Sequence, residues 1–329
     1  MLRKTLLIAL LIVLLTACAP QATPTVAPVA TEIVTTQAPA TEVPTVAPTA
    51  VSTGITLTDG LGREVKLASP AQKIISFAPS NTEILFAIGA GSQVVGRDEL
   101  SDFPEAAKSL TSIGSTFKDL NTEQIVSLHP DLVLAAEINT PEQVKALEGL
   151  GITVYYLKNP TTLEELYGNM EIVAQLTGHE SDAATTIAAL KARVAAVDAK
   201  IATVTTKPTV FYELDATDPA KPYTAGKGTF ITVLIDRAGG KNIASDIDGY
   251  PQFSLEQVVA ANPDFIILGD AAYGITADNV AARPGWGKLS AVTSKQVLPF
   301  DDNLASRPGP RLVDGLEQLA KLLHPELFK

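Results

Sequence analysis

The sequence has few of the residues that several common functions require. It holds one cysteine, Cys18, among 329 residues, so no disulfide can form within the chain. The 25 Lys and Arg residues are outnumbered by 36 Asp and Glu, and no basic stripe is present to neutralise nucleic-acid phosphates. Its three histidines, His129, His179 and His324, are scattered, whereas zinc or manganese capture needs converging ligands. We therefore expect no nucleic-acid partner, no resident metal and no cofactor.

Catalytic motifs are also missing. The chain has no Gly-x-Ser-x-Gly elbow, no zinc-binding helix motif and no phosphate-binding loop, and residues 226–229 (GKGT) are too short and misplaced for one. We predict that the protein is not an enzyme. An anchored extracellular hydrolase and a surface adhesin are the alternatives from other functional classes.

The N-terminus is organised for export. Arg3 and Lys4 precede an apolar run at residues 6–15, which is too short to cross a membrane comfortably and is typical of a secretory signal. Residues 15–18 (LTAC) resemble the lipobox of bacterial lipoproteins, which implies cleavage before Cys18 and attachment of diacylglycerol to its thiol. The alternative is an ordinary signal peptide with an incidental cysteine. We expect a signal peptide at residues 1–17 and an extracytoplasmic protein anchored to the cell membrane by its N-terminal lipid.

A tether and a folded α/β region follow. Residues 18–54 are rich in Thr, Pro and Ala, which favours an extended linker. Beyond them, short apolar runs with β-branched residues alternate with helical patterns, which predicts parallel sheets with helical crossovers. The predicted strands lie at residues 73–77, 131–135, 153–157, 209–214, 264–268 and 296–300.

An internal repeat divides the folded region into two lobes. Residues 121–126 (NTEQIV) and 254–259 (SLEQVV) are each followed, at the same spacing, by Pro-Asp and an apolar strand. Residues 82–89 and 230–239 also resemble each other as helices closed by glycine. Residues 181–204 contain no Pro or Gly and predict one long helix. We predict two Rossmann-like lobes, at residues 55–160 and 207–329, joined by a helical region at residues 161–206.

This layout resembles the cobalamin and ferric-siderophore binding proteins of ABC importers, most closely the cobalamin-binding branch. The resemblance covers about residues 55–323, and its most specific stretches are residues 75–85 (ISFAPSNTEIL), 95–96 (VG), 101–104 (SDFP) and 120–123 (LNTE). It implies a monomer that binds a small molecule between its lobes and delivers it to a permease. The implied ligand is cobalamin or a related corrinoid, and the alternatives are a ferric hydroxamate siderophore or haem.

Ligand contacts are expected in the loops that follow the strands, where open α/β sheets bind their ligands. The candidates are Ser80, Asn81, Asp98, Leu100, Phe117, Glu137, Asp215, Tyr223, Asp270, Tyr273, Asn303 and Arg307. By the resemblance, Phe117 corresponds to a ligand-stacking tryptophan and Arg307 to an arginine of the last cleft loop. Leu100 and Leu304 depart from the pattern, because the cobalamin-binding branch has aromatic residues there. Phe117 has an alternative interpretation as an ordinary aromatic side chain.

The charge of these loops is a second indication of the ligand. They are rich in acids, with few basic residues nearby to neutralise them, which disfavours an anionic ferric catecholate. The acids are Asp98, Glu99, Glu137, Glu213, Asp215, Asp270, Asp301 and Asp302. Ordinary solvated surface carboxylates are the alternative interpretation. Haem would require an iron ligand, for which Tyr223 and Tyr273 are available.

Two glutamates occupy equivalent positions in the repeat. Asn121 and Ser254 are predicted N-caps, which places Glu123 and Glu256 in the first turn of a helix, where a carboxylate complements the helix dipole. The family resemblance implies a further role, in which each glutamate contacts an arginine of the permease. We predict docking at both sites, which is compatible with capping.

Overall fold

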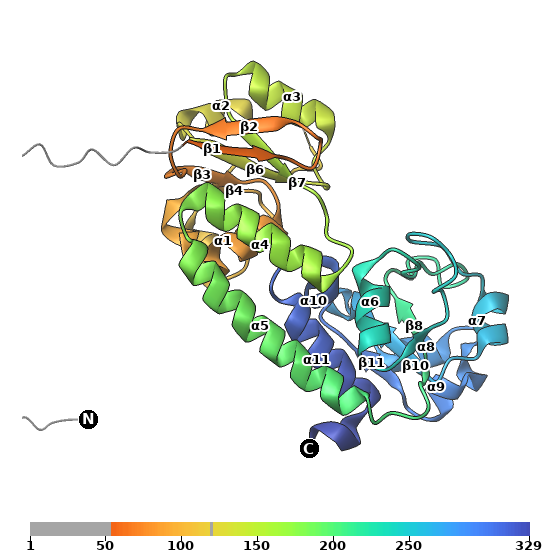
Figure 1. Cartoon of the computed structure of the whole chain (residues 1–329). Helices are drawn as coiled ribbons and strands as arrows, with labels where there is room; N and C mark the ends of the chain where they lie inside the picture. Colours follow the sequence, from red (N-terminus) through yellow and green to blue (C-terminus); the bar gives the residue numbers. More distant parts are fainter. Residues whose placement is uncertain (1–53, 119–120) are drawn as a thin grey trace, which may run out of the picture. The chain divides into compact units, whose positions relative to one another are not determined.

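Two parallel sheets form the centre of the protein, in a computed structural model that describes residues 54–118 and 121–329 (Figure 1). The predicted signal peptide, Cys18 and nearly all of the linker lie outside the described residues. The first sheet has the order β5 (Thr111–Ser112), β4 (Val94–Arg97), β3 (Ile74–Ser76), β6 (Leu132–Ala136) and β7 (Val154–Leu157). An antiparallel hairpin of β1 (Ile55–Thr58) and β2 (Glu64–Leu67) precedes it.

The second sheet has the order β11 (Val297–Pro299), β10 (Phe265–Leu268), β8 (Thr209–Glu213) and β9 (Lys241–Asn242). All its pairings are parallel, as are those of the first sheet. Each predicted strand is confirmed, and together they form β3, β6, β7, β8, β10 and β11. Strands β1, β2, β4, β5 and β9 were not predicted, because they are short or lack a continuous apolar run.

Helices follow the strands in both lobes. The N-terminal lobe contains α1 (Pro79–Ala87), α2 (Thr122–Ser127) and α3 (Pro141–Gly149), and the C-terminal lobe contains α6 (Phe230–Arg237), α7 (Leu255–Ala261), α8 (Ala277–Ala282), α9 (Ser290–Thr293), α10 (Asn303–Ser306) and α11 (Leu312–Leu323). Short 3-10 helices lie at η1 (Ala90–Gln93), η2 (Glu105–Ser109), η3 (Gly269–Tyr273), η4 (Trp286–Lys288) and η5 (Pro325–Phe328). The α/β fold class predicted from the sequence is confirmed.

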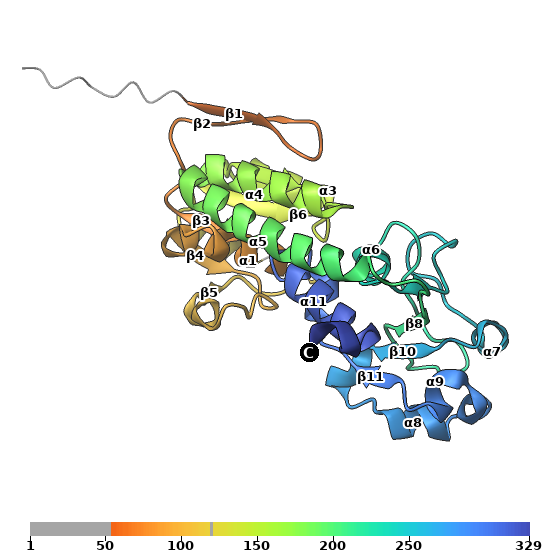
Figure 2. The same ribbon diagram turned by 60° about the horizontal axis from the view of Figure 1, so that its bottom comes forward.

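The predicted long helix is α5 (Glu180–Ile201), preceded by α4 (Leu163–Thr177) and the left-handed turn at Gly178. Its buried residues Ile187, Leu190, Val194 and Val197 recur at the spacing that gives a helix one apolar stripe. This stripe explains why the helix packs on a core instead of standing free in solvent. Helix α5 lies against α4 and α11 (Figures 1 and 2).

One apolar cluster connects the two sheets. It contains Ile74 and Leu134 of the first sheet, Val210 and Ile267 of the second, and the buried stripe of α5. Separate clusters cover the other face of each sheet, around Ile75 and Val133 in one case and Phe211 and Ile266 in the other. The strands are therefore buried on both faces, as parallel sheets require.

Polar contacts reinforce the packing of α5 on α11. Arg193 of α5 donates hydrogen bonds to Asp314 and Glu317 of α11 at 2.6–2.9 Å. Because all three side chains are partly exposed, solvent screening limits their contribution, and the apolar stripe remains the main contact.

Candidate ligand-binding site

A cavity of 660 Å³ lies at the carboxyl ends of β8 and β10. Its volume falls within the range of roughly 300–1,000 Å³ that small-molecule sites occupy. Its wall consists of Leu214, Asp215, Ala216, Thr217, Gly269, Asp270, Tyr273, Ile275 and Asp302. Three predicted site residues, Asp215, Asp270 and Tyr273, are therefore brought together. Asp302, Thr217 and Ile275 join them without having been proposed as contacts.

Asp270 is the least ordinary residue of this wall. It lies in η3 directly after β10, is 4% exposed, and neither carboxylate oxygen has a hydrogen-bond partner. Burial and the neighbouring charge of Glu213 raise its pKa to about 6, although Arg283 and the nearby Ala216 N–H act in the opposite direction. Asp270 is therefore a buried acid without a dedicated cation.

Glu213, by contrast, has a complete partner. It ends β8 and accepts hydrogen bonds from Nη1 and Nη2 of Arg283 at 2.5 and 2.8 Å, and both side chains are buried. The Arg283 guanidinium also lies 4.9 Å from the centre of the Trp286 ring. The expectation that few of these acids are neutralised is thus wrong for Glu213, because Arg283 approaches from a loop 70 residues away in the chain.

The remaining cavity acids are held by local hydrogen bonds. The Tyr212 hydroxyl donates to Asp302 at 2.7 Å, and burial raises the pKa of Asp302. Asp215 accepts from the Thr217 backbone N–H at 2.7 Å, which lowers its pKa. Tyr273 is 88% exposed and forms part of the rim. No lysine or arginine lines the described cavity.

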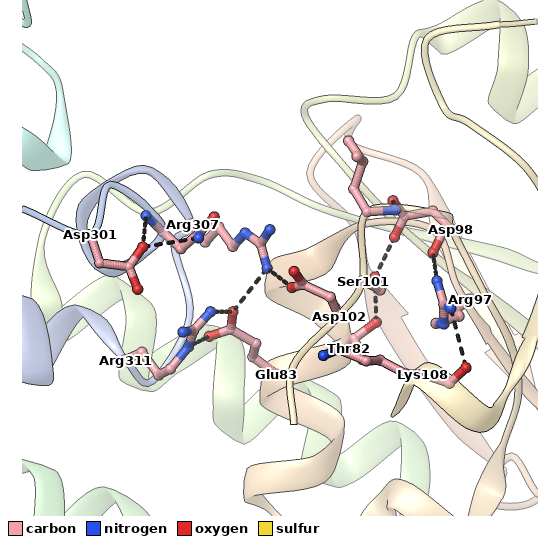
Figure 3. Close-up of polar contacts among 12 residues, drawn as sticks. Thr82, Glu83, Arg97, Asp98, Ser101, Asp102, Lys108, Asp301, Arg307 and Arg311 are labelled. Atoms are coloured by element: carbon pink, nitrogen blue, oxygen red, sulfur yellow. Dashed lines mark hydrogen bonds and ion pairs between the residues drawn. The ribbon is translucent and has the colours of Figure 1, made fainter. Parts of the chain in front are cut away.

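An ion-pair network joins the two lobes beside α1. Glu83 of α1 is 1% exposed at its side chain and accepts hydrogen bonds from Arg311 at 2.5 and 3.0 Å. Arg307 donates to Asp102 at 2.5 Å and lies 3.9 Å from Glu83 (Figure 3). The Arg311 guanidinium also covers the Phe103 ring at 4.0 Å. The network therefore fixes the loop after β4 against the loop before α11.

The predicted ligand contact Arg307 belongs to this network. Burial opposes ionisation of Asp102, but the hydrogen bond and charge of Arg307 still lower the pKa of that carboxyl. Asn303 lies nearby and donates to Asp301 at 2.9 Å. Sequence reasoning did not find the pairing of Glu83 with Arg311, because 228 residues separate the two partners.

Buried hydroxyl groups position the loop that carries Asp102. The Thr82 hydroxyl oxygen lies 2.7 Å from that of Ser76 and 2.8 Å from that of Ser101. Ser101 in turn donates to Asp98 (Figure 3). Asp98 also accepts from the Leu100 backbone N–H at 3.0 Å. Burial raises the pKa of Asp98 despite these hydrogen bonds.

Several predicted contacts of the N-terminal lobe occupy other environments than expected. Asp98 and Asn81 are fully buried, and Asn81 donates to the Leu134 carbonyl, so both side chains hold the loops in place. Backbone groups and Ser101 already bond these side chains, and ligand contact by either residue stays a prediction. Ser80 is also buried. The exposed candidates of this lobe are Leu100, Phe117 and Glu137, and those of the C-terminal lobe are Asp215, Tyr223 and Tyr273.

The two repeat-related glutamates lie in exposed first turns of α2 and α7. Asn121 and Ser254 accept hydrogen bonds from the N–H groups of Gln124 and Gln257, as predicted. Of these two helices, α7 has the reciprocal bond of a capping box, whereas the Gln124 side chain of α2 donates to Ser127 instead. Both N-caps are confirmed, while docking by Glu123 and Glu256 stays a prediction.

Within residues 54–118 and 121–329, no three His, Cys, Asp or Glu side chains are grouped so as to hold a metal ion. Over the same residues, none of the helices is sufficiently long and apolar to span a membrane.

Known proteins share this fold and sequence pattern. Residues 74–304 match the model of the periplasmic binding protein family. The ABC transporter substrate-binding lipoprotein YvrC of Bacillus subtilis is 34% identical over 280 residues, which cover 84% of this chain and 87% of the relative. The cobalamin-binding protein of Halobacterium salinarum is 31% identical over 278 residues, covering 82% and 74%.

A solved structure resembles the chain to a similar degree. The periplasmic haem-binding protein RhuT of Roseiflexus sp. RS-1, in its apo form, is 29% identical with a TM-score of 0.70 and covers 78% of this chain and 99% of its own. The match of the family model to most of the folded region, together with these relatives, shows that the chain belongs to the periplasmic binding protein family.

Proposed function

We propose that the protein is a lipid-anchored extracytoplasmic substrate-binding protein of an ABC importer, and that its ligand is cobalamin or a related corrinoid. The negative charge of the cavity is the observation that favours this ligand. Its wall contains Asp215, Asp270 and Asp302 and no basic side chain. Corrinoids such as cobalamin carry neutral amide side chains that can donate to carboxylates, whereas haem and ferric catecholates carry negative charge that this wall repels. The name of the Halobacterium relative supports the same choice.

Haem is the second candidate, and Tyr273 is the observation that favours it. A tyrosine oxygen is one of the protein ligands that haem iron accepts. Tyr273 lines the cavity and is 88% exposed, so its hydroxyl is accessible to a bound ligand. The name of the RhuT structure agrees with this alternative.

Calorimetric titration of the full-length protein with cyanocobalamin, haemin and a ferric hydroxamate distinguishes the candidates. The buried Trp286, stacked near Arg283 behind the cavity wall, gives an independent fluorescence signal. We expect saturable one-to-one binding of cyanocobalamin and weak binding of haemin. Tight haemin binding that is lost in Tyr273→Phe, with no corrinoid signal, would overturn the corrinoid assignment.

We propose that the permease is contacted through Glu123 and Glu256. Both are exposed, each belongs to a different lobe, and the helix N-termini that carry them are equivalent in the repeat. A carboxylate at such a position can form a charge-assisted hydrogen bond to an arginine of a partner. The position of the two residues away from the cavity wall separates docking from ligand binding.

The proposed membrane anchor is Cys18. The basic start, the apolar run and the small residues that end at the only cysteine motivate it. The similarity to a relative named as a substrate-binding lipoprotein supports the assignment.

A further inference from the structure

The interior behind the cavity contains two acids and one base. Glu213 and Asp270 are both buried, and Arg283 is the cation that faces them. Arg283 places both terminal nitrogens on Glu213 and its flat face near Trp286. Arg283 therefore directs its hydrogen bonds in this site at Glu213. The carboxylate of Asp270 remains without a hydrogen-bonded counter-charge.

No other group of the described wall supplies the missing donor. The Tyr212 hydroxyl donates to Asp302, and the Ala216 N–H lies near Asp270 without completing a hydrogen bond. The other charged side chains of the cavity wall are Asp215 and Asp302, which are acids as well. The charge of Arg307 acts on Asp302 from outside the wall, but Arg307 donates its hydrogen bond to Asp102. A buried carboxylate without donors destabilises a fold, and such groups are concentrated at functional sites.

A ligand that enters the cavity can provide what the fold does not. Asp270 lines the cavity, with both oxygens shielded from water. Because both oxygens are shielded in the ligand-free protein, contact with an entering N–H group requires the side chain to turn toward the cavity. A carboxylate of the ligand, in contrast, would meet Asp215, Asp270 and Asp302 in a wall that contains no basic side chain.

We propose that Asp270 is the residue that determines ligand specificity in this cavity: it accepts a hydrogen bond from a primary amide or ammonium group of the ligand and excludes ligands that carry a carboxylate there. The inference rests on the proposed function where it identifies the donor as a corrin side-chain amide. The proposal goes beyond that function because it places the amide-bearing edge of the ligand in the cavity of the C-terminal lobe.

Two corrinoids that differ in this chemistry test the proposal. Cobinamide carries amides on the corrin ring, whereas cobyrinic acid carries carboxylates at the corresponding positions. We would measure the affinity of the full-length wild-type protein, Asp270→Asn and Asp270→Ser for both compounds at pH 7.5. Asp218→Asn is the matched control, because Asp218 is an exposed acid that accepts a hydrogen bond from the Ala220 N–H of its own turn and is not part of the cavity wall.

Wild-type protein should bind cobinamide more tightly than cobyrinic acid by roughly 100-fold or more. Cobyrinic acid loses the charge-assisted hydrogen bond to Asp270 and adds repulsion between carboxylates, which together produce a difference of this order. Asp270→Asn should reduce that preference by about tenfold or more, whereas Asp218→Asn should change it by less than about threefold. Thermal melts would show that each variant is folded. Tight cobinamide binding with the same preference in both Asp270 variants would overturn the role of Asp270 and leave the proposed function standing. Binding of neither corrinoid by wild-type protein would overturn both.

Discussion

Replacing Asp270 with asparagine should stabilise the ligand-free protein at neutral pH. The substitution keeps the size and shape of the side chain but removes a charge that is 4% exposed and lacks a hydrogen-bond partner. In most buried positions, loss of an acid destabilises a protein because a partner is left unpaired. Here, the hydrogen bonds between Arg283 and Glu213 remain intact.

The magnitude follows from the pKa of Asp270. It is about 6 in the folded protein, against an ordinary value of 3.8, and each pKa unit corresponds to about 1.4 kcal/mol. Ionisation of the buried carboxylate therefore lowers the free energy of unfolding by up to about 3 kcal/mol. Because one side of the residue faces the cavity, solvent screens part of this cost, and we expect the charge to account for about 1–3 kcal/mol. An unpaired N–H of the new asparagine offsets part of this gain by a similar amount at every pH.

The dependence on pH isolates the charge. Because the folded pKa lies above the unfolded one, the folded state binds the proton more tightly, and wild-type stability falls as the pH rises from about 4 to about 6. Asp270→Asn lacks this loss. Its melting temperature relative to the wild type should thus be higher at pH 7.5 than at pH 4.5, by roughly 2–4 °C for each kcal/mol.

Differential scanning calorimetry of the two proteins at both pH values measures this difference. Asp215→Asn serves as the control, because local hydrogen bonds lower the pKa of Asp215 and its removal should give no gain at pH 7.5. An equal melting-temperature difference at pH 4.5 and 7.5 would refute the reasoning, since it would mean that the charge of Asp270 costs the fold nothing.

Three further predictions concern the lobes, the permease and the membrane. Glu83→Ala leaves the charge of its arginine partner unpaired in a mostly buried site, so it should lower the free energy of unfolding, measured by chemical denaturation, by roughly 3–5 kcal/mol. Asp102→Ala, at an exposed position, should lower it by under about 1 kcal/mol. Similar losses for the two variants would contradict the weight given to burial. The double variant Glu123→Gln and Glu256→Gln should keep ligand affinity but sharply reduce association with the importer and ligand uptake. Each lost charge-assisted contact weakens the free energy of docking by roughly 2–5 kcal/mol. Normal uptake would show that both residues only cap their helices. Intact mass of membrane-extracted protein should show loss of residues 1–17 and added acyl chains, both absent in Cys18→Ala, and an unacylated mature chain would exclude the anchor.

The sequence predicted those features that depend on local pattern. The apolar runs identified the central strands, the residues without Gly or Pro identified α5, and the repeat identified the N-caps of α2 and α7. Edge strands such as β5 and β9 have only two residues each and no periodic signal, so they were missed. Their existence depends on the neighbouring strand to which they bond.

The site was predicted only in part, because its chemistry depends on distant pairings. The loops after β8 and β10 were correctly expected to meet, but the partner of Glu213 is an arginine beyond α8 that no local motif indicates. For the same reason, an arginine placed among the ligand contacts, Arg307, proved to bond Asp102 of the other lobe. Residue type and loop position show which acids gather at an edge, whereas only the fold shows which of them already have a partner.

The apolar cluster that runs from one sheet through α5 to the other has a consequence for how the chain can be divided. Neither lobe has a complete interior of its own, because residues such as Leu134 and Val210 share a single cluster with the stripe of α5. A fragment that ended after either sheet would expose that face to water and would be prone to aggregate. The two lobes, although they repeat each other in sequence, therefore form one cooperative unit of folding, and gene truncations should respect residues 55–329 as a whole.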